Sequence, residues 1–179
     1  MLAKKRKSKL LSFIGLIFIL AAITAGFVFF VNLQNVLLFK PKTVKIYFFK
    51  DNTLSYVERT LPKNAMPLYF AAEQLLLGPN EAESAKGYYS EIPKGTKIIS
   101  VYKKGDTIIA DFSNELGNYG GGTAKVQSLL AQIVYTFLEQ SKAKKVQILV
   151  GGKTETILGG EGFLIDKPLT KDDVEARDL

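Results

Sequence analysis

The sequence predicts an α/β (α+β) fold, a two-layer sandwich of two helices on one mixed or antiparallel sheet, preceded by one transmembrane helix. Three patterns predict this architecture. Residues 10–39 carry no formal charge and are mostly apolar. Several later segments alternate apolar and polar residues, which is typical of half-buried strands. Two other segments repeat their apolar residues at helical spacing, so each has one face that needs a sheet to cover it.

The N-terminal segment is predicted to anchor the chain in a cell membrane. Residues 10–31 are almost wholly apolar, and about 20 such residues in a helix cross the hydrocarbon core of a bilayer. Residues 1–9 hold five basic side chains, which predicts a cytoplasmic N-terminus and an extracytoplasmic C-terminal domain. A cleaved signal peptide is the alternative, but its apolar region usually spans only about 7–15 residues. Residues 32–42 are predicted to be a short juxtamembrane linker.

The charge distribution argues against a nucleic-acid partner. The chain of 179 residues has a net charge of +7, which could indicate nucleic-acid binding. From Lys40 onward, however, there are 19 basic and 17 acidic residues. The excess of positive charge is therefore mainly an orientation signal at the N-terminus, and the exported domain is nearly neutral.

The first half of the domain is predicted to be a hairpin followed by a helix. Residues 43–60 form two strand-like runs around the turn signal Asp51-Asn52. A helix is expected over residues 68–77, and Gly78 and Pro79 are expected to end it, because glycine accepts positive φ and proline cannot continue a helix. The polar segment that follows, through Pro93 and Gly95, is predicted to be loop with at most one helical turn.

The second half repeats this order with a longer helix. Two strand-like runs flank the turn at residues 103–106. Residues 126–138 then place seven apolar side chains on one helical face, which is the strongest periodic signal in the domain. Residues 145–150 are predicted to be another strand, and residues 153–158 are expected to pair back onto it. The domain is predicted to span residues 43–170, and residues 171–179 are expected to be a frayed, charged tail.

The composition excludes most catalytic and metal-binding designs. The chain has neither His nor Cys, which leaves no Ser-His-Asp or Cys-His catalysis, no disulfide and no His- or Cys-ligated metal site. We therefore expect a protein that is not an enzyme and that binds no cofactor and no metal.

Six segments, in order, carry a resemblance to a known family. They are LLLGPN, IPKGTKIISV, IADFS, GGGTAKVQSLLAQIVYTF, KVQILVGGK and LGGEGFLIDKPL. Together they resemble the GerMN domain, a family named from a sporulation and germination protein. The resemblance covers roughly residues 43–170 and implies an extracytoplasmic fold similar to the ring-building motifs of secretion and sporulation channels, used for assembly with partners. The protein that gave the family its name looks different, because it is a lipoprotein with two such domains.

Turn and cap residues are the first candidate sites. Gly120, Gly121 and Gly122 precede the long helix, where free N–H groups can bind an anion. The simpler interpretation is a structural entry loop with Thr123 as N-cap. Gly159 and Gly160 are expected to form a second tight turn. These residues join those named above as structural or interaction positions: Gly78, Pro79, Pro93, Gly95, Asp111, Gly121, Gly122, Thr123, Gly159, Gly160 and Glu161.

Carboxylates and aromatic residues leave a second hypothesis open. Asp111 and Glu161 could act as an acid–base pair on a glycan, if the fold holds their carboxyl groups about 5–9.5 Å apart. Asp111 more simply ends a strand through hydrogen bonds to the main chain. Four aromatic residues could form an exposed patch for glycan or protein contact: Phe49, Tyr88, Tyr89 and Tyr102.

The combined prediction is a membrane-anchored, non-enzymatic interaction domain. It would act in sporulation, germination or the assembly of another envelope complex, with other envelope proteins or with copies of itself as partners. The alternative is a module that binds or remodels peptidoglycan.

Overall fold

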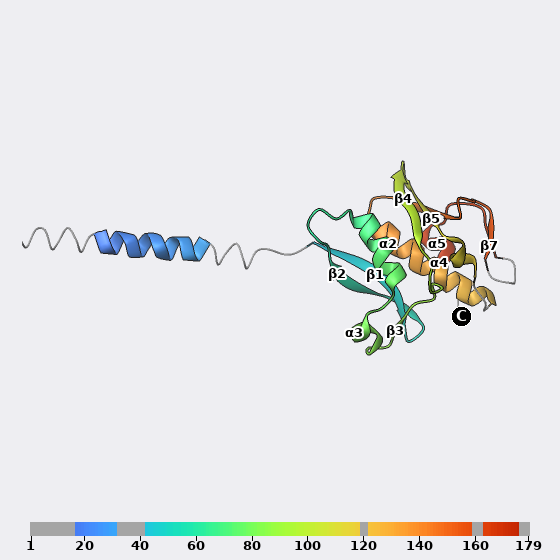
Figure 1. Ribbon diagram of the computed structural model, residues 1–179, viewed down its shortest axis with the longest axis horizontal. Helices are drawn as coiled ribbons and strands as arrows, with labels where there is room; N and C mark the ends of the chain where they lie inside the picture. Colours follow the sequence, from blue (N-terminus) through green and yellow to red (C-terminus); the bar gives the residue numbers. More distant parts are fainter. Residues whose placement is uncertain (1–16, 32–41, 119–121, 159–162, 176–179) are drawn as a thin grey trace, which may run out of the picture. The chain divides into compact units, whose positions relative to one another are not determined.

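The computed structural model describes residues 17–31, 42–118, 122–158 and 163–175 (Figure 1). The chain divides into two compact units, Met1–Pro41 and Lys42–Leu179. In the first unit, residues 17–31 are helical, whereas residues 10–16 of the predicted span and residues 32–41 of the linker lie outside the described part. Among the described residues, no helix combines the length and the apolar character needed to cross a bilayer.

The second unit opens with the predicted hairpin. Strands β1 (Thr43–Lys50) and β2 (Thr53–Thr60) pair antiparallel along their whole length. The turn residues Asp51 and Asn52 have φ values of 50° and 60°, the geometry of a type I′ turn, which matches the twist of the flanking strands. Strand β3 (Tyr88–Tyr89) pairs with the other edge of β1, so this sheet has the order β2-β1-β3.

A second sheet contains β4 (Ile98–Lys104), β5 (Thr107–Phe112) and β6 (Lys145–Val150), in the order β4-β5-β6. Strands β4 and β5 form the predicted hairpin, and β5 runs parallel to β6. The long helix α4 (Gly122–Glu139) supplies the crossover between these parallel strands, as parallel pairing requires.

The prediction of one continuous sheet is therefore wrong. The described strands form two three-stranded sheets and one two-stranded pair. The reason lies at the free edge of β1. Strand β3 pairs with only Phe49 and Lys50. Side chains of α4 hydrogen-bond to the main chain of Tyr47, and Gln140, which follows α4, bonds to that of Lys45. No strand can then join the two sheets along this edge.

The pairing predicted for residues 153–158 is also wrong. Strand β7 (Thr156–Leu158) pairs antiparallel with β8 (Phe163–Ile165) instead of β6. Only Lys153 bridges to Val150. At the start of β6, Leu169 exchanges two main-chain hydrogen bonds of 2.8 Å with Val146, so part of the edge that β7 would need is occupied.

Short helices complete the domain. Helix α2 (Pro67–Leu77) ends at Gly78, whose φ of 77° confirms the predicted stop. The one predicted helical turn is α3 (Glu81–Ser84), and η1 (Asn114–Gly117) follows β5. The charged tail was predicted to fray from residue 171, but Lys171–Val174 forms helix α5, because Thr170 and Asp173 make a capping box and Val174 is buried.

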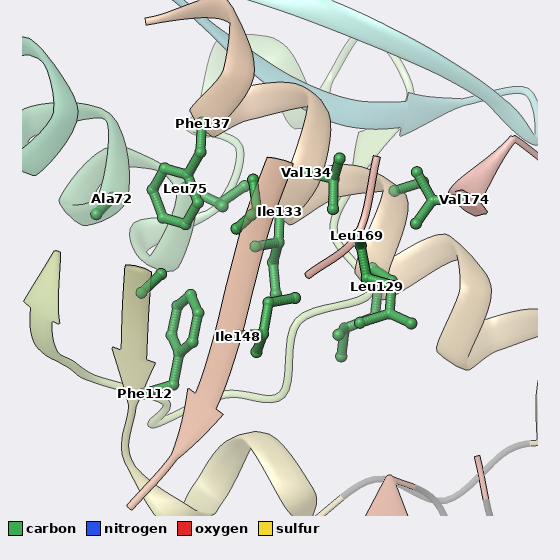
Figure 2. Packing of buried hydrophobic residues seen from close by; sticks show 14 of the residues in the cluster. Ala72, Leu75, Phe112, Leu129, Ile133, Val134, Phe137, Ile148, Leu169 and Val174 are labelled. Atoms are coloured by element: carbon green, nitrogen blue, oxygen red, sulfur yellow. The ribbon is translucent and has the colours of Figure 1, made fainter. Parts of the chain in front are cut away.

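The hydrophobic core lies between α4 and its neighbours. Helix α4 contacts β1, β2, β6, α2 and α5. Figure 2 shows Ile133 and Phe137 of α4 directed toward Ile148 of β6 and Phe112 of β5, and the two phenylalanine rings lie 6.2 Å apart. All the residues buried around them belong to the second unit, which explains why this unit is compact by itself.

Candidate functional site

The non-core face of the β1–β2 hairpin is rich in tyrosine. Along β1, side chains alternate, so Val44, Ile46 and Phe48 enter the core while the next residues point the opposite way. Tyr47 and its cross-strand partner Tyr56 meet on this second face, with ring centroids 5.7 Å apart. The ring of Tyr135 from α4 lies 5.3 Å from that of Tyr47, so three tyrosines form a continuous row over the hairpin and α4.

A groove of about 480 Å³ adjoins this row. Its apolar lining includes Phe49, Leu54, Ala131 and Val174, which come from β1, β2, α4 and α5. Tyr89 and Tyr135 also line it, and its remaining lining is mainly polar: Asn52, Thr53, Glu91, Lys125, Gln127, Ser128 and Glu175. Size, apolar surface and a few polar groups are the usual features of a ligand or anchor pocket.

Hydrogen bonds hold the two lining tyrosines in place. The hydroxyl of Tyr89 donates to Oδ1 of Asn52 at 2.9 Å, and the hydroxyl of Tyr135 donates to Oε1 of Glu175 at 2.8 Å. The ring of Tyr89 also lies 5.9 Å from that of Phe49. Because these rings are already fixed, a partner that enters the groove loses little entropy in ordering them.

The environment raises the pKa values of these tyrosines above their ordinary range. Burial, followed by the hydrogen bond to Glu175, raises the pKa of Tyr135 to about 12. The pKa of Tyr89 is raised by burial and then by the charges of Glu91 and Asp51. The pKa of Tyr47 is likewise raised, chiefly by burial. At neutral pH the groove therefore presents uncharged aromatic surface.

Three polar side chains, two on α4 and one on the residue that follows it, fix the helix against β1. Gln132 and Thr136 are fully buried, at 0 % exposure. The amide of Gln132 accepts from the N–H of Glu91 at 2.7 Å and donates to the carbonyl of Tyr47 at 3.2 Å. The hydroxyl of Thr136 accepts from the N–H of Tyr47 at 3.0 Å. One turn further, Gln140 donates to the carbonyl of Lys45 at 2.8 Å.

A charged cluster borders the tyrosine row. Glu139 lies 3.1 Å from the Nζ of Lys45 and 3.8 Å from the Nζ of Lys171. These two ammonium groups lie over the rings of Tyr56 and Tyr135, at 4.6 and 4.7 Å from the centroids. The hydrogen bond to Glu139 raises the pKa of Lys45, so Lys45 remains charged beside Tyr56 at neutral pH.

The predicted turn at Gly78 and Pro79 has a structural role. The guanidinium of Arg59, from β2, donates to the carbonyl of Gly78 at 2.9 Å and forms an ion pair with Glu83. Both side chains of this pair are 13 % exposed. Arg59 therefore links the end of α2 to the start of α3, a role that no sequence pattern had assigned to it.

Pro93 and Gly95 also form the turn that was predicted. The N–H of Thr96 donates to the carbonyl of Pro93 at 3.3 Å, and Gly95 has a φ of 86°. A positive φ at the third position is the geometry of a type II turn, which favours glycine there.

Asp111 makes a main-chain hydrogen bond at the end of β5. Its Oδ1 accepts from the N–H of Gly152 at 2.9 Å, which ties the end of β5 to the turn after β6. The neighbouring Gly151 has a φ of 59°, and a Cβ atom there would lie 2.5 Å from Oδ1 of Asn114. This junction therefore needs glycine for two independent reasons. The suggested partner carboxylate, Glu161, lies outside the described residues.

The glycine-rich entry to α4 is described only in part. The helix begins at Gly122, so Thr123 lies inside its first turn and the prediction of Thr123 as N-cap is wrong by this boundary. Gly120 and Gly121 lie outside the described residues, as do Gly159 and Gly160. Nearby Lys125 lines the groove.

The expected aromatic patch forms only in part. Phe49 and Tyr89 do meet at the groove, but Tyr102 belongs to β4 in the other sheet, and Tyr88 packs partly against the core. Tyr47, Tyr56 and Tyr135 were missed. The alternation that places Val44, Ile46 and Phe48 in the core also puts Tyr47 on the opposite face, and could have indicated it. Within the described ranges, no three acidic residues lie close enough together to hold a metal ion.

Comparisons with known proteins agree with this fold. A family model described as "Germane: Sporulation and spore germination" matches residues 45–156. No curated protein sequence matches the chain. The first GerMN domain of the sporulation protein GerM from Bacillus subtilis is 25% identical, with a TM-score of 0.60, and the match covers 74% of this chain and 99% of that one.

Two further structures are similar. A candidate lipoprotein from Clostridium perfringens is 26% identical, with a TM-score of 0.52, over 76% of this chain and 91% of that one. The tandem GerMN domains of GerM from Bacillus subtilis are 20% identical, with a TM-score of 0.59, over 75% of this chain. This chain spans about half of that tandem structure, 47% of its length. Because the family model matches more than half of the chain, this protein belongs to the Germane family of sporulation and spore germination, with a GerMN-like fold.

Proposed function

We propose that this protein is a membrane-anchored, extracytoplasmic interaction domain that assembles with other envelope proteins and catalyses no reaction. The observation that carries the proposal is the groove, because its rings are fixed in advance by hydrogen bonds within the domain. Such a site suits an apolar side chain of a partner polypeptide, which would insert against Phe49, Leu54 and Ala131.

The N-terminal sequence supports the proposed anchoring. Residues 10–39 are uncharged and follow five basic side chains, a combination that favours insertion with the N-terminus in the cytoplasm. Family membership supports a place in sporulation, germination or another assembly of the cell envelope. The absence of His and Cys from the sequence supports a binding role over a catalytic one.

The experiment is a cross-linking pull-down of this protein from cells. It compares the wild type, whose groove is open, with a variant whose groove is filled by a larger side chain. Ser128 lines the groove from α4, so the large side chain of Ser128→Trp would occupy part of its volume. Ser84→Trp, on the exposed helix α3, is the matched control, because both hydroxyls make a single long hydrogen bond to a main-chain carbonyl. We expect one envelope protein to be captured by the wild type and by the control, and to be lost with Ser128→Trp. Equal capture by all three proteins would refute a partner in the groove.

A second candidate function is peptidoglycan binding. Asn52 and Gln127 line the groove beside two tyrosines, and amides with aromatic rings are chemistry that also recognises sugars. Sedimentation of the domain, residues 42–179, with purified cell wall distinguishes the two functions. Co-pelleting that is abolished by Ser128→Trp would favour peptidoglycan, whereas no co-pelleting would exclude it.

A further inference from the structure

The second sheet has a face that no described element covers. Helices α2 and α4 pack on the core side, where Ile108, Ala110 and Phe112 of β5 are buried. The alternate residues of β5, which are Thr107, Ile109 and Asp111, point to the other side and remain partly exposed. We call this second side the open face of β4-β5-β6.

The register of the strands orders the open face into three rows. The middle row is Tyr102, Ile109 and Gln147, one residue from each strand. The row at one end is Lys104, Thr107 and Lys145, and the row at the other end is Ser100, Asp111 and Leu149. Tyr102 is 50% exposed, so the middle row offers aromatic and aliphatic surface to a partner.

Charge separates the two ends of the open face. Lys104 and Lys145 flank Thr107, and neither ammonium group has a partner among the residues that the structure describes. Asp106 precedes Thr107 at that end and accepts from its hydroxyl at 3.1 Å. The opposite end carries Asp111, whose Oδ1 accepts from the N–H of Gly152 and whose Oδ2 has no hydrogen-bond partner in the described part of the chain.

From this distribution we infer that the open face of β4-β5-β6 packs against the same face of a second copy of this chain. The two copies are related by a two-fold axis that lies between the two sheets, parallel to their planes and perpendicular to the strands. That axis places the lysine row of one copy over the Asp111 row of the other, and Ile109 over Ile109. A two-fold axis parallel to the strands would instead bring Lys104 of one copy toward Lys145 of the other and set the two Asp111 carboxylates against each other. Charge complementarity therefore selects the first arrangement.

The contact is small, and this decides the method of detection. Three strands of about five residues each cover about 14 Å by about 17 Å, less than a standard stable interface. Covalent capture in membranes is therefore more suitable than a measurement of size in dilute solution. Because packed sheets lie about 10 Å apart, a short bis-maleimide is suitable and a direct disulfide is too short.

The sequence makes this capture unambiguous, because the full chain contains no Cys. With Ile109→Cys as the only thiol, we expect several-fold more cross-linked dimer than with Lys86→Cys, an exposed control remote from the open face. Adding Lys104→Glu and Lys145→Glu to Ile109→Cys should reduce the dimer to the control level. An Ile109→Cys yield no higher than that of the control would overturn the inference.

A mixed experiment tests the direction of the axis. Cells would produce two tagged copies, one with Ser100→Cys and the other with Lys104→Cys. We expect cross-links between these two copies and few between identical copies. In a second pair of tagged copies, Ser100→Cys is replaced by Lys145→Cys. Preferential linkage of Lys104→Cys to Lys145→Cys would overturn the proposed axis. Lysines that contact anionic lipid in place of a second copy would give no Ser100–Lys104 product, which would overturn the inference as well.

Discussion

The two three-stranded sheets differ in how the main-chain hydrogen-bonding groups of their central strands find partners. In β4-β5-β6 the middle strand has a full strand on each side. In β2-β1-β3 the middle strand has a full partner only in β2. Much of its other edge is hydrogen-bonded by Gln132 and Thr136 of α4 and by Gln140, the residue after α4. Polar side chains therefore take the place of a neighbouring strand along much of this edge of β1.

This difference predicts unequal sensitivity to mutation. The first sheet should depend on individual polar side chains, because each satisfies buried groups that have no substitute. The second should tolerate the loss of polar side chains but not a change in the shape of its turns. The comparison would fail if matched substitutions in the two sheets had equal effects.

The largest effect is expected for Arg59→Met. Arg59 donates to Gln74, to Gly78 and to Glu83, and its loss would leave the carboxylate of Glu83 with little solvent and no cation. We expect the free energy of unfolding of residues 42–179 to fall by about 3–5 kcal/mol, measured by urea denaturation. Lys104→Met in the second sheet is the control and should change it by less than about 0.5 kcal/mol. A small effect of Arg59→Met would show that the hydrogen bonds and the ion pair of Arg59 are not needed for the stability of the first sheet.

Gln132→Leu tests the connection between α4 and β1 directly. The substitution keeps the approximate volume but removes a hydrogen-bond partner from two part-buried main-chain groups, the N–H of Glu91 and the carbonyl of Tyr47. A loss of about 2–4 kcal/mol is expected from the two lost bonds. Gln147→Leu, on the open face of β4-β5-β6, loses one bond of 3.3 Å to a main-chain carbonyl and should have little effect. Similar losses for both variants would contradict the comparison.

Gly151→Ala examines the turn that closes the second sheet. Both Gly151 and Gly152 have positive φ, but only at Gly151 would a Cβ atom meet another group, Oδ1 of Asn114 at 2.5 Å. Each alanine should cost about 1 kcal/mol for its backbone conformation, and Gly151→Ala should cost a further 1–2 kcal/mol or so for the displacement of Asn114. Thermal unfolding of the two variants gives the difference. Equal melting temperatures would indicate that Asn114 moves without cost.

The smallest effect concerns the pH dependence of the groove. The pKa of Tyr135 is raised from 10.0 to about 12, by burial first and then by Glu175. Below pH 10 Tyr135 keeps its proton in both the folded and the unfolded state, so it adds no pH dependence to the stability. Between pH 10 and 12 the unfolded state loses it first, and stability falls as the pH rises. Tyr135→Phe should therefore show a weaker loss of stability than the wild type over this range. Parallel curves would contradict the raised pKa.

The local elements of this fold could be predicted from the sequence, but their connections could not. The apolar alternation of β1, the helical spacing of α4 and the glycine stop at Gly78 are local signals, and they were sufficient. The division into two sheets depends on Gln132 and Gln140, whose polar character is equally compatible with an exposed helix face. A sequence pattern does not distinguish a buried amide with three partners from a solvated one.

The groove was harder to predict, because its residues come from five separate elements. Phe49 and Tyr89 were expected to be near each other, and strand β3 does place them side by side. Tyr135 lies in the middle of α4, where its spacing indicates only partial burial. Its partner Glu175 belongs to a segment predicted to fray, and burial of Val174 places it at the groove.

The most direct test of the account is to place a photo-crosslinking amino acid at two positions of the full chain in cells. One is Gln127, which lines the groove, and the other is Ile109, which lies at the centre of the open face of β4-β5-β6. We expect an adduct with a different envelope protein at Gln127, lost when Ser128→Trp is added, and an adduct with a second copy of this chain at Ile109. The same adduct at both positions, or a Gln127 adduct that survives Ser128→Trp, would contradict it.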